Sequence, residues 1–191
     1  MEFKDIIEFL KSNLDKYRYE HTLRVVSMGE TLAEKFNFED VNKVRLACYL
    51  HDAGKNISHY EILNMVLNEG MKLTNVEIEN VHIFHGIASM VIARDKFKIS
   101  DIEVLNAIKN HVTGVENMSM LDKIVFLADF FEEGRNYDLV HESRDAALIE
   151  LNINKSLVLA CDSIIKDLIV RGKFIHENTL KTRNFALKNV K

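Results

Sequence analysis

Six residues with metal-binding side chains occupy positions on otherwise apolar helical faces. They are His21, His51, Asp52, His85, His111 and Asp129. Polar and charged groups on such faces need partners, because burying them alone is costly. A lone histidine there is more often a hydrogen-bonded core residue, and a buried aspartate usually caps a helix or pairs with arginine. Six such residues on at least five helical segments favour one shared site instead.

Imidazole and carboxylate together form the donor set for Zn, Mn, Fe, Co or Ni. Six donors exceed what one tetrahedral site needs, so their number suits two ions that share a carboxylate. Such two-metal sites serve phosphoryl-group hydrolysis, because the ions hold both the attacking and the leaving oxygen. Lys55 stands three residues after Asp52, where it could reach a phosphate. His82 lies close to the face of His85.

The other three histidines, His59, His141 and His176, sit in polar surroundings and are expected at the surface.

The elements that would position these residues all show helical periodicity. The chain has no proline and only seven glycines among its 191 residues, so helices have few breakers. We expect helices over residues 3–14, 17–36, 41–52, 58–68, 75–97 with a break near Gly86, 101–114, 118–134, 138–152 and 154–171, and a last one from His176. No segment shows convincing strand alternation. The sequence therefore predicts an all-α helical bundle.

Composition limits the function classes. The formal net charge of −4 gives no support for bulk binding of DNA or RNA. No apolar run reaches transmembrane length, so no membrane partner is expected. Cys48 and Cys161 stand alone and are most simply buried thiols. A reducing cytoplasm is the expected location.

The pattern H…HD…H…H…D on a helical scaffold resembles the HD-domain metal-dependent phosphohydrolases. The likeness covers residues 17 to about 135, and helices over 138–188 complete what we expect to be one HD-type domain, residues 1–191. Several segments together resemble the YqeK-type branch of symmetrical diadenosine-tetraphosphate hydrolases: EHTLRV, LHDAGK, FHGIAS, AIKNHVTG and LDKIVFLADFFEEGR. An isolated HD pair is a weak signal, but these segments in this order are specific.

The resemblance implies a role for each residue at the site. His21, His51, Asp52 and Asp129 would bind one metal ion, and Asp52 would bridge to a second ion held by His85 and His111. The ions would be transition metals, with iron the first expectation and manganese or another divalent ion the second. A homodimer is plausible, although the oligomeric state is not readable from the sequence.

The expected reaction is attack of a metal-activated hydroxide on a β-phosphorus of the tetraphosphate, which yields two ADP. Asp52 and Lys55 are the expected catalytic residues. Positive neighbours must stabilise the transferring phosphoryl group. The expected substrate-binding residues are Lys55, Arg135, Lys123, Arg24 and Thr113. For Lys123 a surface ion pair or a solvated position is about equally expected, and Arg24 could instead orient an acidic partner.

Two alternatives stay open. Another nucleotide could be the substrate of the same HD chemistry: a nucleoside triphosphate, a 5′-nucleotide or a cyclic nucleotide. A non-catalytic module that binds metal or nucleotide is the second alternative, and turnover with added metal separates it from an enzyme.

Overall fold

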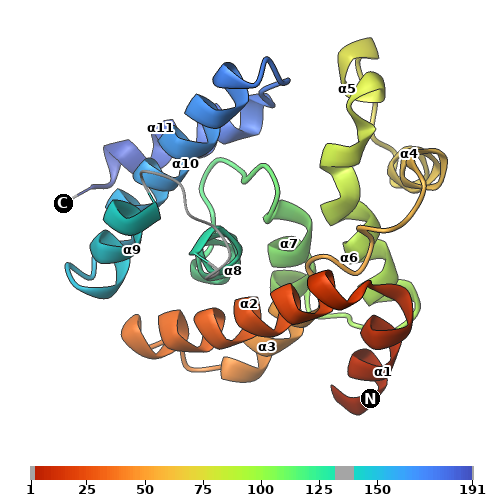
Figure 1. Ribbon diagram of the computed structural model, residues 1–191, viewed down its shortest axis with the longest axis horizontal. Coiled ribbons are helices and arrows are strands. Elements are labelled where there is room, and N and C mark those ends of the chain that lie inside the picture. Colours follow the sequence, from red (N-terminus) through yellow and green to blue (C-terminus); the bar gives the residue numbers. More distant parts are fainter. Residues whose placement is uncertain (1–2, 132–139, 191) are drawn as a thin grey trace.

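Every regular element in the described residues, 3–131 and 140–190, is a helix in the computed structural model (Figure 1). The all-α prediction is therefore confirmed for this part of the chain. The elements are α1 (Phe3–Asn13), α2 (Lys16–Lys35), α3 (Val41–Leu50), α4 (His59–Asn68), α5 (Asn75–Glu79), the 3-10 helix η1 (Val81–Phe84), α6 (His85–Asp95), α7 (Ile102–Asn110), α8 (Met120–Phe131), α9 (Val140–Leu148), α10 (Ile153–Val170) and α11 (Glu177–Lys188).

Short polar residues begin these helices where the sequence predicts. Asp40 accepts hydrogen bonds from the first backbone N–H groups of α3, and Asp101 does the same for α7. Ser58 and Glu61 form a reciprocal capping box at α4. Gly172 follows α10 with a φ of +59°, a conformation that glycine adopts without strain. Local sequence thus fixes where the site-bearing helices begin and end.

The predicted break near Gly86 in the helix over residues 75–97 is confirmed. Residues 75–97 form α5, η1 and α6, and the break lies before His85 rather than at Gly86. Gly86 serves packing instead, because a Cβ there would lie 2.6 Å from the Lys109 carbonyl oxygen of α7. The break makes His85 the first residue of α6. The predicted helix end at Gly134 lies outside the described residues.

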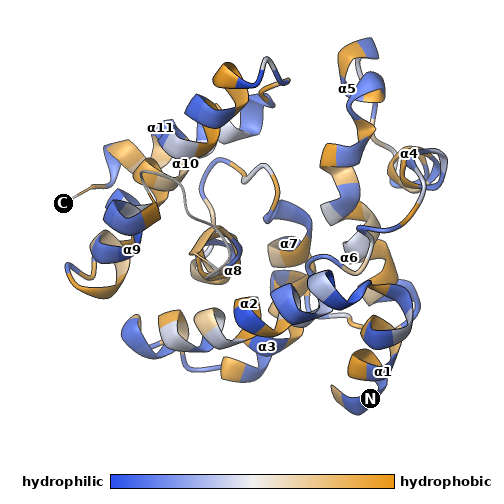
Figure 2. Cartoon of the chain, in the orientation of Figure 1, coloured by the Kyte–Doolittle hydropathy of each residue, from blue (hydrophilic) through white to orange (hydrophobic). Residues whose placement is uncertain are grey.

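Helix α8 forms the centre of the bundle. It packs against α2, α3, α7, α9 and α10 (Figure 1), and nine of its twelve residues are buried. Most surrounding helices carry both hydrophilic and hydrophobic residues (Figure 2), as amphipathic helices around a core do. Among the described helices, none has the length and apolar character that a bilayer span requires.

A close contact between the turn after α3 and helix α6 positions the HD pair. The Gly54 N–H donates to Ser89 Oγ at 2.9 Å. A Cβ at Gly54 would lie 2.8 Å from the Ser89 nitrogen and 2.9 Å from the Ala88 Cβ. Glycine therefore lets the turn that carries Asp52 and Lys55 lie directly on α6.

Substitution of this glycine should disturb both stability and the site. We expect Gly54→Ala to cost about 1–3 kcal/mol of unfolding free energy, because α6 backbone cannot yield to the added methyl. Metal affinity should fall as well, since Asp52 moves with the turn. Urea unfolding and metal titration measure the two effects.

The matched control is Gly70→Ala, at a positive φ of 78° with no atom near the added Cβ. It should cost about 1–2 kcal/mol through backbone strain alone and leave metal affinity unchanged. Wild-type metal affinity in Gly54→Ala would contradict the positioning role.

Candidate metal centre

The fold brings the six predicted donor residues together. His21 comes from α2, His51 and Asp52 from the end of α3, His85 from the start of α6, His111 from the end of α7 and Asp129 from α8. The four histidines and Asp52 are buried, and the Asp129 side chain is 15% exposed. His21 Nε2 lies 3.2 Å from Asp129 Oδ1 and 3.3 Å from His51 Nε2. Donor atoms within 4.8 Å of one another form two groups that could hold a metal: His21, His51 and Asp129, and His51, Asp52 and His111.

Three histidines each make the same type of hydrogen bond to the backbone. The Nδ1 atoms of His51, His85 and His111 lie 2.7–2.8 Å from the carbonyl oxygens of Cys48, His82 and Ile108, each three residues earlier. A carbonyl only accepts, so Nδ1 carries the proton in each ring. The Nε2 lone pair of each ring then faces the site. A hydrogen bond from the other ring nitrogen to a carbonyl commonly orients a histidine that binds metal through Nε2.

The contact between His85 and His111 tests whether the residues fit a metal. Their Nε2 atoms are 3.2 Å apart, and both nitrogens present lone pairs when the rings are neutral. Burial lowers the pKa of His85 to about 4, with Lys55 lowering it further and Asp52 opposing the shift. The His85 ring is therefore neutral near pH 7, and its Nε2, which carries no proton, cannot donate a hydrogen bond to His111 Nε2. A cation between them resolves the contact, so the residues fit a metal ion.

Asp52 offers its two carboxylate oxygens to different sides of the site. Oδ1 lies 3.1 Å from His85 Nε2 and 3.6 Å from His111 Nε2, while Oδ2 lies 3.8 Å from His51 Nε2. Oδ1 is buried without a hydrogen-bond partner, which is costly unless a cation binds there. This arrangement suits a bridging carboxylate.

Charges around Asp52 keep it ionised. Burial would raise its pKa, but the nitrogens of His51, His111, His85 and Lys55 outweigh burial and hold the pKa well below its usual range. Burial also lowers the pKa of His51 to about 4. Asp52 is thus charged while His51 and His85 are neutral, which is the protonation state that metal binding requires.

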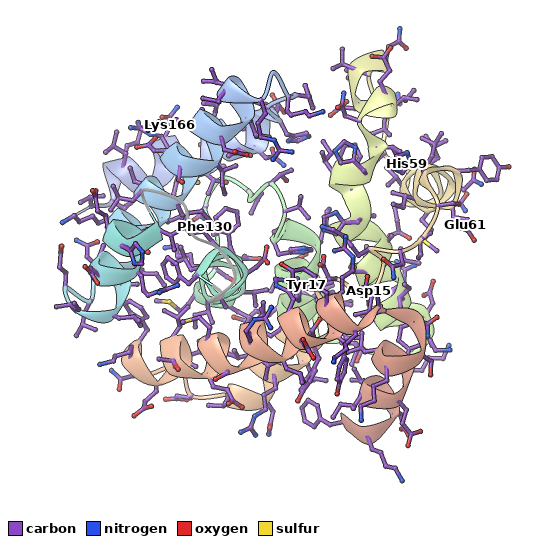
Figure 3. The ribbon with its side chains drawn as sticks, viewed as in Figure 1. Asp15, Tyr17, His59, Glu61, Phe130 and Lys166 are labelled. Atoms are coloured by element: carbon purple, nitrogen blue, oxygen red, sulfur yellow. The ribbon has the colours of Figure 1, made fainter. Side chains whose placement is uncertain are left out.

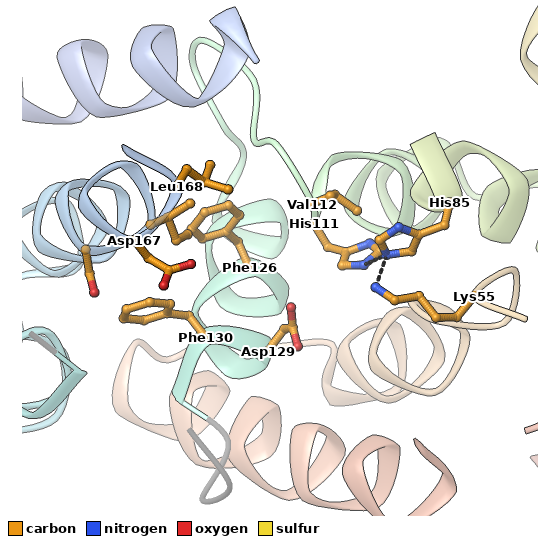
Figure 4. Close-up of a pocket in the computed structure, with 11 residues that line it drawn as sticks. Lys55, His85, His111, Val112, Phe126, Asp129, Phe130, Asp167 and Leu168 are labelled. Atoms are coloured by element: carbon orange, nitrogen blue, oxygen red, sulfur yellow. Dashed lines mark hydrogen bonds between the residues drawn. The ribbon is translucent and has the colours of Figure 1, made fainter. Parts of the chain in front are cut away.

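Two cations stand beside Asp52. Lys55 Nζ lies 3.5 Å from Asp52 Oδ1 and 2.9 Å from His85 Nε2, to which it donates (Figure 4). Arg18, one helical turn before His21, lies 3.7 Å from Asp52 Oδ2. Sequence reasoning missed Arg18, although its position three residues before His21 on α2 was a readable signal.

The cluster opens into two adjoining cavities. The first, here the aromatic cavity, has a volume of about 200 Å³ and is lined by Lys55, His85, His111, Val112, Phe126, Asp129, Phe130, Ser163, Ile164, Asp167 and Leu168. Figure 4 shows Lys55 and the two histidines on one side, with Phe126, Phe130 and Asp167 on the other. Asp129 lies between the two groups.

The second cavity, here the basic cavity, has a volume of about 600 Å³ and contains four cationic side chains: Arg18, Lys55, Arg171 and Lys173. It shares Lys55, His85, Val112, Ile164 and Leu168 with the aromatic cavity, so the two meet beside the metal-binding residues. Its volume falls in the range of roughly 300–1,000 Å³ typical of small-molecule sites.

The predicted substrate contacts have different outcomes. Thr113 lines the basic cavity, as does Lys55. Arg24 is half-buried on α2 and lines neither cavity. Lys123 donates to Asn154 Oδ1 at 2.9 Å on the side of α8 that faces α10, and burial lowers its pKa. Neither of these last two lines the aromatic or the basic cavity, and Arg135 lies outside the described residues.

The remaining histidines divide between surface and cavity. His141 and His59 are exposed as expected, but His59 also lines the basic cavity. His82 supports His85 through its backbone carbonyl, while its own ring is exposed in the basic cavity. The surface prediction for His176 is wrong. This residue caps α11, lies 3.2 Å from Glu77 of α5 and lines the basic cavity.

A buried carboxylate supports the loop after His111. Asp122 accepts from Asn110 Nδ2 at 3.0 Å and from the Ser119 backbone N–H at 2.8 Å. These bonds tie the end of α7 to the start of α8. Asp122 therefore holds His111 and Asp129 in a fixed relation without entering the site.

Comparison with known proteins identifies relatives over the whole chain. The model of the HD domain family matches residues 18–134. The symmetrical bis(5′-nucleosyl)-tetraphosphatase of Halalkalibacterium halodurans is 30% identical over 95% of both chains. The protein of the same name from Staphylococcus aureus is 31% identical over 92% of this chain and 89% of its own.

A solved structure is also similar over nearly the full length. It is a predicted HD superfamily hydrolase involved in NAD metabolism from Clostridium acetobutylicum, with 38% identity and a TM-score of 0.92. The match covers 99% of this chain and 98% of that one.

Metal binding should stabilise the folded protein. A divalent ion at a thousandfold excess over its Kd adds about 4 kcal/mol, which corresponds to a rise in Tm of roughly 10 °C for a chain of this size. Asp52→Asn should abolish most of this rise because it removes the bridging charge. Asp145→Asn, at an exposed site on α9, should retain it. Differential scanning calorimetry of chelator-stripped protein with Mn²⁺ measures both, and an equal rise in the two variants would contradict the assignment.

The metal-free protein should lose stability as the pH falls from about 6.5 to about 4. His51 and His85 have an ordinary pKa of 6.5 and a folded pKa of about 4. The unfolded chain therefore takes up these protons first, which favours unfolding by at most about 3 kcal/mol per histidine. Urea unfolding with a chelator present, from pH 7 to pH 4, measures the slope.

A His51→Gln/His85→Gln variant is the comparison for this pH dependence. Its unfolding free energy should fall less steeply over the same range, because two of the protonating groups are gone. Equal slopes would show that other groups dominate.

Proposed function

Because this chain belongs to the HD domain family, we propose that it is a metal-dependent phosphohydrolase that cleaves diadenosine tetraphosphate into two ADP. The observation that carries the proposal is the convergence of the His85 and His111 lone pairs beside a bridging carboxylate, at the junction of two cavities. The two relatives named symmetrical tetraphosphatases support the substrate, since each matches about nine tenths or more of this chain.

We assign the six clustered residues as ligands of two ions: His21, His51, Asp52, His85, His111 and Asp129. Two bound divalent ions would lower the pKa of water and supply a hydroxide nucleophile near neutral pH. Such a hydroxide would attack one of the two central phosphorus atoms, and the bond from that phosphorus to the central bridging oxygen would break. One ADP keeps the bridging oxygen, the other gains the oxygen of water, and a proton is released.

The chain's own cations act on the phosphates. Lys55 Nζ now donates to the single Nε2 lone pair of His85, which is the same lone pair that a metal ion would use. A metal ion at His85 would therefore free the ammonium group of Lys55 to bind the phosphates of the substrate. There it stabilises the negative charge of the transferring phosphoryl group. The leaving group is a nucleoside diphosphate, so a strong general acid is not required.

Iron is the proposed metal, with manganese or another divalent ion as the alternative, since mixed imidazole and carboxylate donors suit several ions. The cytoplasm is the proposed location, because both cysteines are free and buried. We also propose that residues 1–191 act as one domain, that Thr113 and Arg135 belong to the substrate site, and that a homodimer is the assembly to test.

The deciding experiment is hydrolysis of diadenosine tetraphosphate by chelator-stripped protein with Fe(II), Mn(II) or Co(II) restored. We expect ADP as the sole nucleotide product, and only with metal. ATP plus AMP would overturn the symmetric site of attack. The same assay tests four other kinds of substrate in parallel: NAD⁺, nucleoside triphosphates, 5′-nucleotides and cyclic nucleotides. Faster turnover of one of these would transfer the proposal to that substrate, and no turnover with tight metal binding would favour a binding module.

Lys55→Ala should separate substrate binding from metal binding. We expect kcat/KM to fall about 10- to 100-fold, because a hydrogen bond to a charged group contributes about 1.5–3 kcal/mol. The metal-induced rise in Tm should remain. Lys109→Ala, on an exposed face of α7, is the control and should match the wild type in both measurements. Normal turnover by Lys55→Ala would show that its phosphate role is wrong.

A further inference from the structure

The basic cavity and the aromatic cavity meet beside the metal-binding residues, where Lys55 and His85 line both. Cleavage at the centre of a tetraphosphate requires room for two phosphates and a nucleoside on each side of the central bridging oxygen. A single pocket beside the metals would hold only one of these halves. The two cavities share Lys55 and His85, so a linear phosphate chain could pass from one to the other across the ligands.

The charge of the basic cavity matches a phosphate ligand. Four cationic side chains line it, and none of the described residues that line it is an aspartate or glutamate. Arg18 and Arg171 are partly neutralised by Asp52 and Asp167, at 3.7 and 3.1 Å. Lys173 has no ion-pair partner in the described part of the chain. Because the whole chain is acidic, this concentration of positive charge is local and would attract an anion.

An aromatic side chain lies next to the unpaired cation. Phe174 follows Lys173 in the turn between α10 and α11, is half-buried and lines the cavity. Its ring lies edge-on to His176, with centroids 6.2 Å apart, and His176 is held from α5 by Glu77 at 3.2 Å. His176 thus supports the Phe174 ring, and a nucleobase could stack on that ring.

From these observations we infer that the basic cavity binds one nucleoside diphosphate half of the substrate, with Lys173 on the phosphates and Phe174 against the base. The inference rests on the proposed function. It assigns a substrate role to the turn Arg171–Phe174, which lies beyond the residues that the HD domain family matches.

Fluorescence tests occupancy without requiring turnover. The chain contains no tryptophan, so Phe174→Trp places a single reporter in the cavity. We expect saturable quenching of this tryptophan by ADP and by diadenosine tetraphosphate in the presence of a chelator. Ile149→Trp is the control, at a residue that is 73% exposed between α9 and α10 and lines neither cavity, and it should not respond.

Kinetics tests the contribution of the turn. Phe174→Ala should raise KM for diadenosine tetraphosphate about tenfold, as expected for the loss of base stacking, with kcat within about twofold of the wild type. Lys173→Ala should raise KM by a similar factor, and less so at high salt. Lys166→Ala is the control for charge, at an exposed residue of α10 that lines neither cavity (Figure 3).

The outcomes separate this inference from the proposed function. Hydrolysis of diadenosine tetraphosphate with unchanged KM in both alanine variants, and no fluorescence response in Phe174→Trp, would overturn the inference and leave the function standing. Saturable quenching of the Phe174→Trp variant by ADP, without hydrolysis of diadenosine tetraphosphate by the wild type, would support the subsite and overturn the function.

Discussion

The rest of the site depends on one repeated hydrogen bond. In His51, His85 and His111 the ring Nδ1–H donates to the backbone carbonyl three residues earlier, at 2.7–2.8 Å. His51 and His111 follow the last residues of α3 and α7, where backbone carbonyls lack the partner that a longer helix would provide, and His85 begins α6. The bond therefore satisfies a carbonyl and turns a lone pair inward at the same time. Three lone pairs then converge on Asp52, and that convergence makes the cluster suited to cations.

Most of the fold and the donor set could be predicted from the sequence, for a physical reason. Helical periodicity is a local property, and caps such as Asp40, Ser58 and Asp101 act within one turn. A polar residue on an apolar face also reveals itself locally, as Asp129 does inside α8. The break near Gly86 was also predicted, although the structural reason for this glycine is the approach of α6 to α7 and not a bend.

The residues that complete the cavities could not be predicted in this way. Asp167 and Phe174 lie in an ordinary amphipathic helix and the turn after it, and only the packing of α10 against α8 brings Asp167 near Asp129. His176 looked like a surface residue because its neighbours are polar, yet its partner Glu77 is about a hundred positions away in the chain. Lys123 is a residue that was expected at the site but lies elsewhere. It stands six residues before Asp129, on another face of α8, beside Asn154.

The donor residues and the opposite walls of the cavities come from different parts of the sequence. All six donor residues lie within residues 18–134, the part matched by the HD domain family. The opposite walls of both cavities come from α10 and the turn after it, through Ile164, Leu168, Arg171, Lys173 and Phe174. Metal ions bound to donors of this kind can activate water beside many phosphates. The second part closes the space beside these donor residues, and so its side chains limit what can lie next to them.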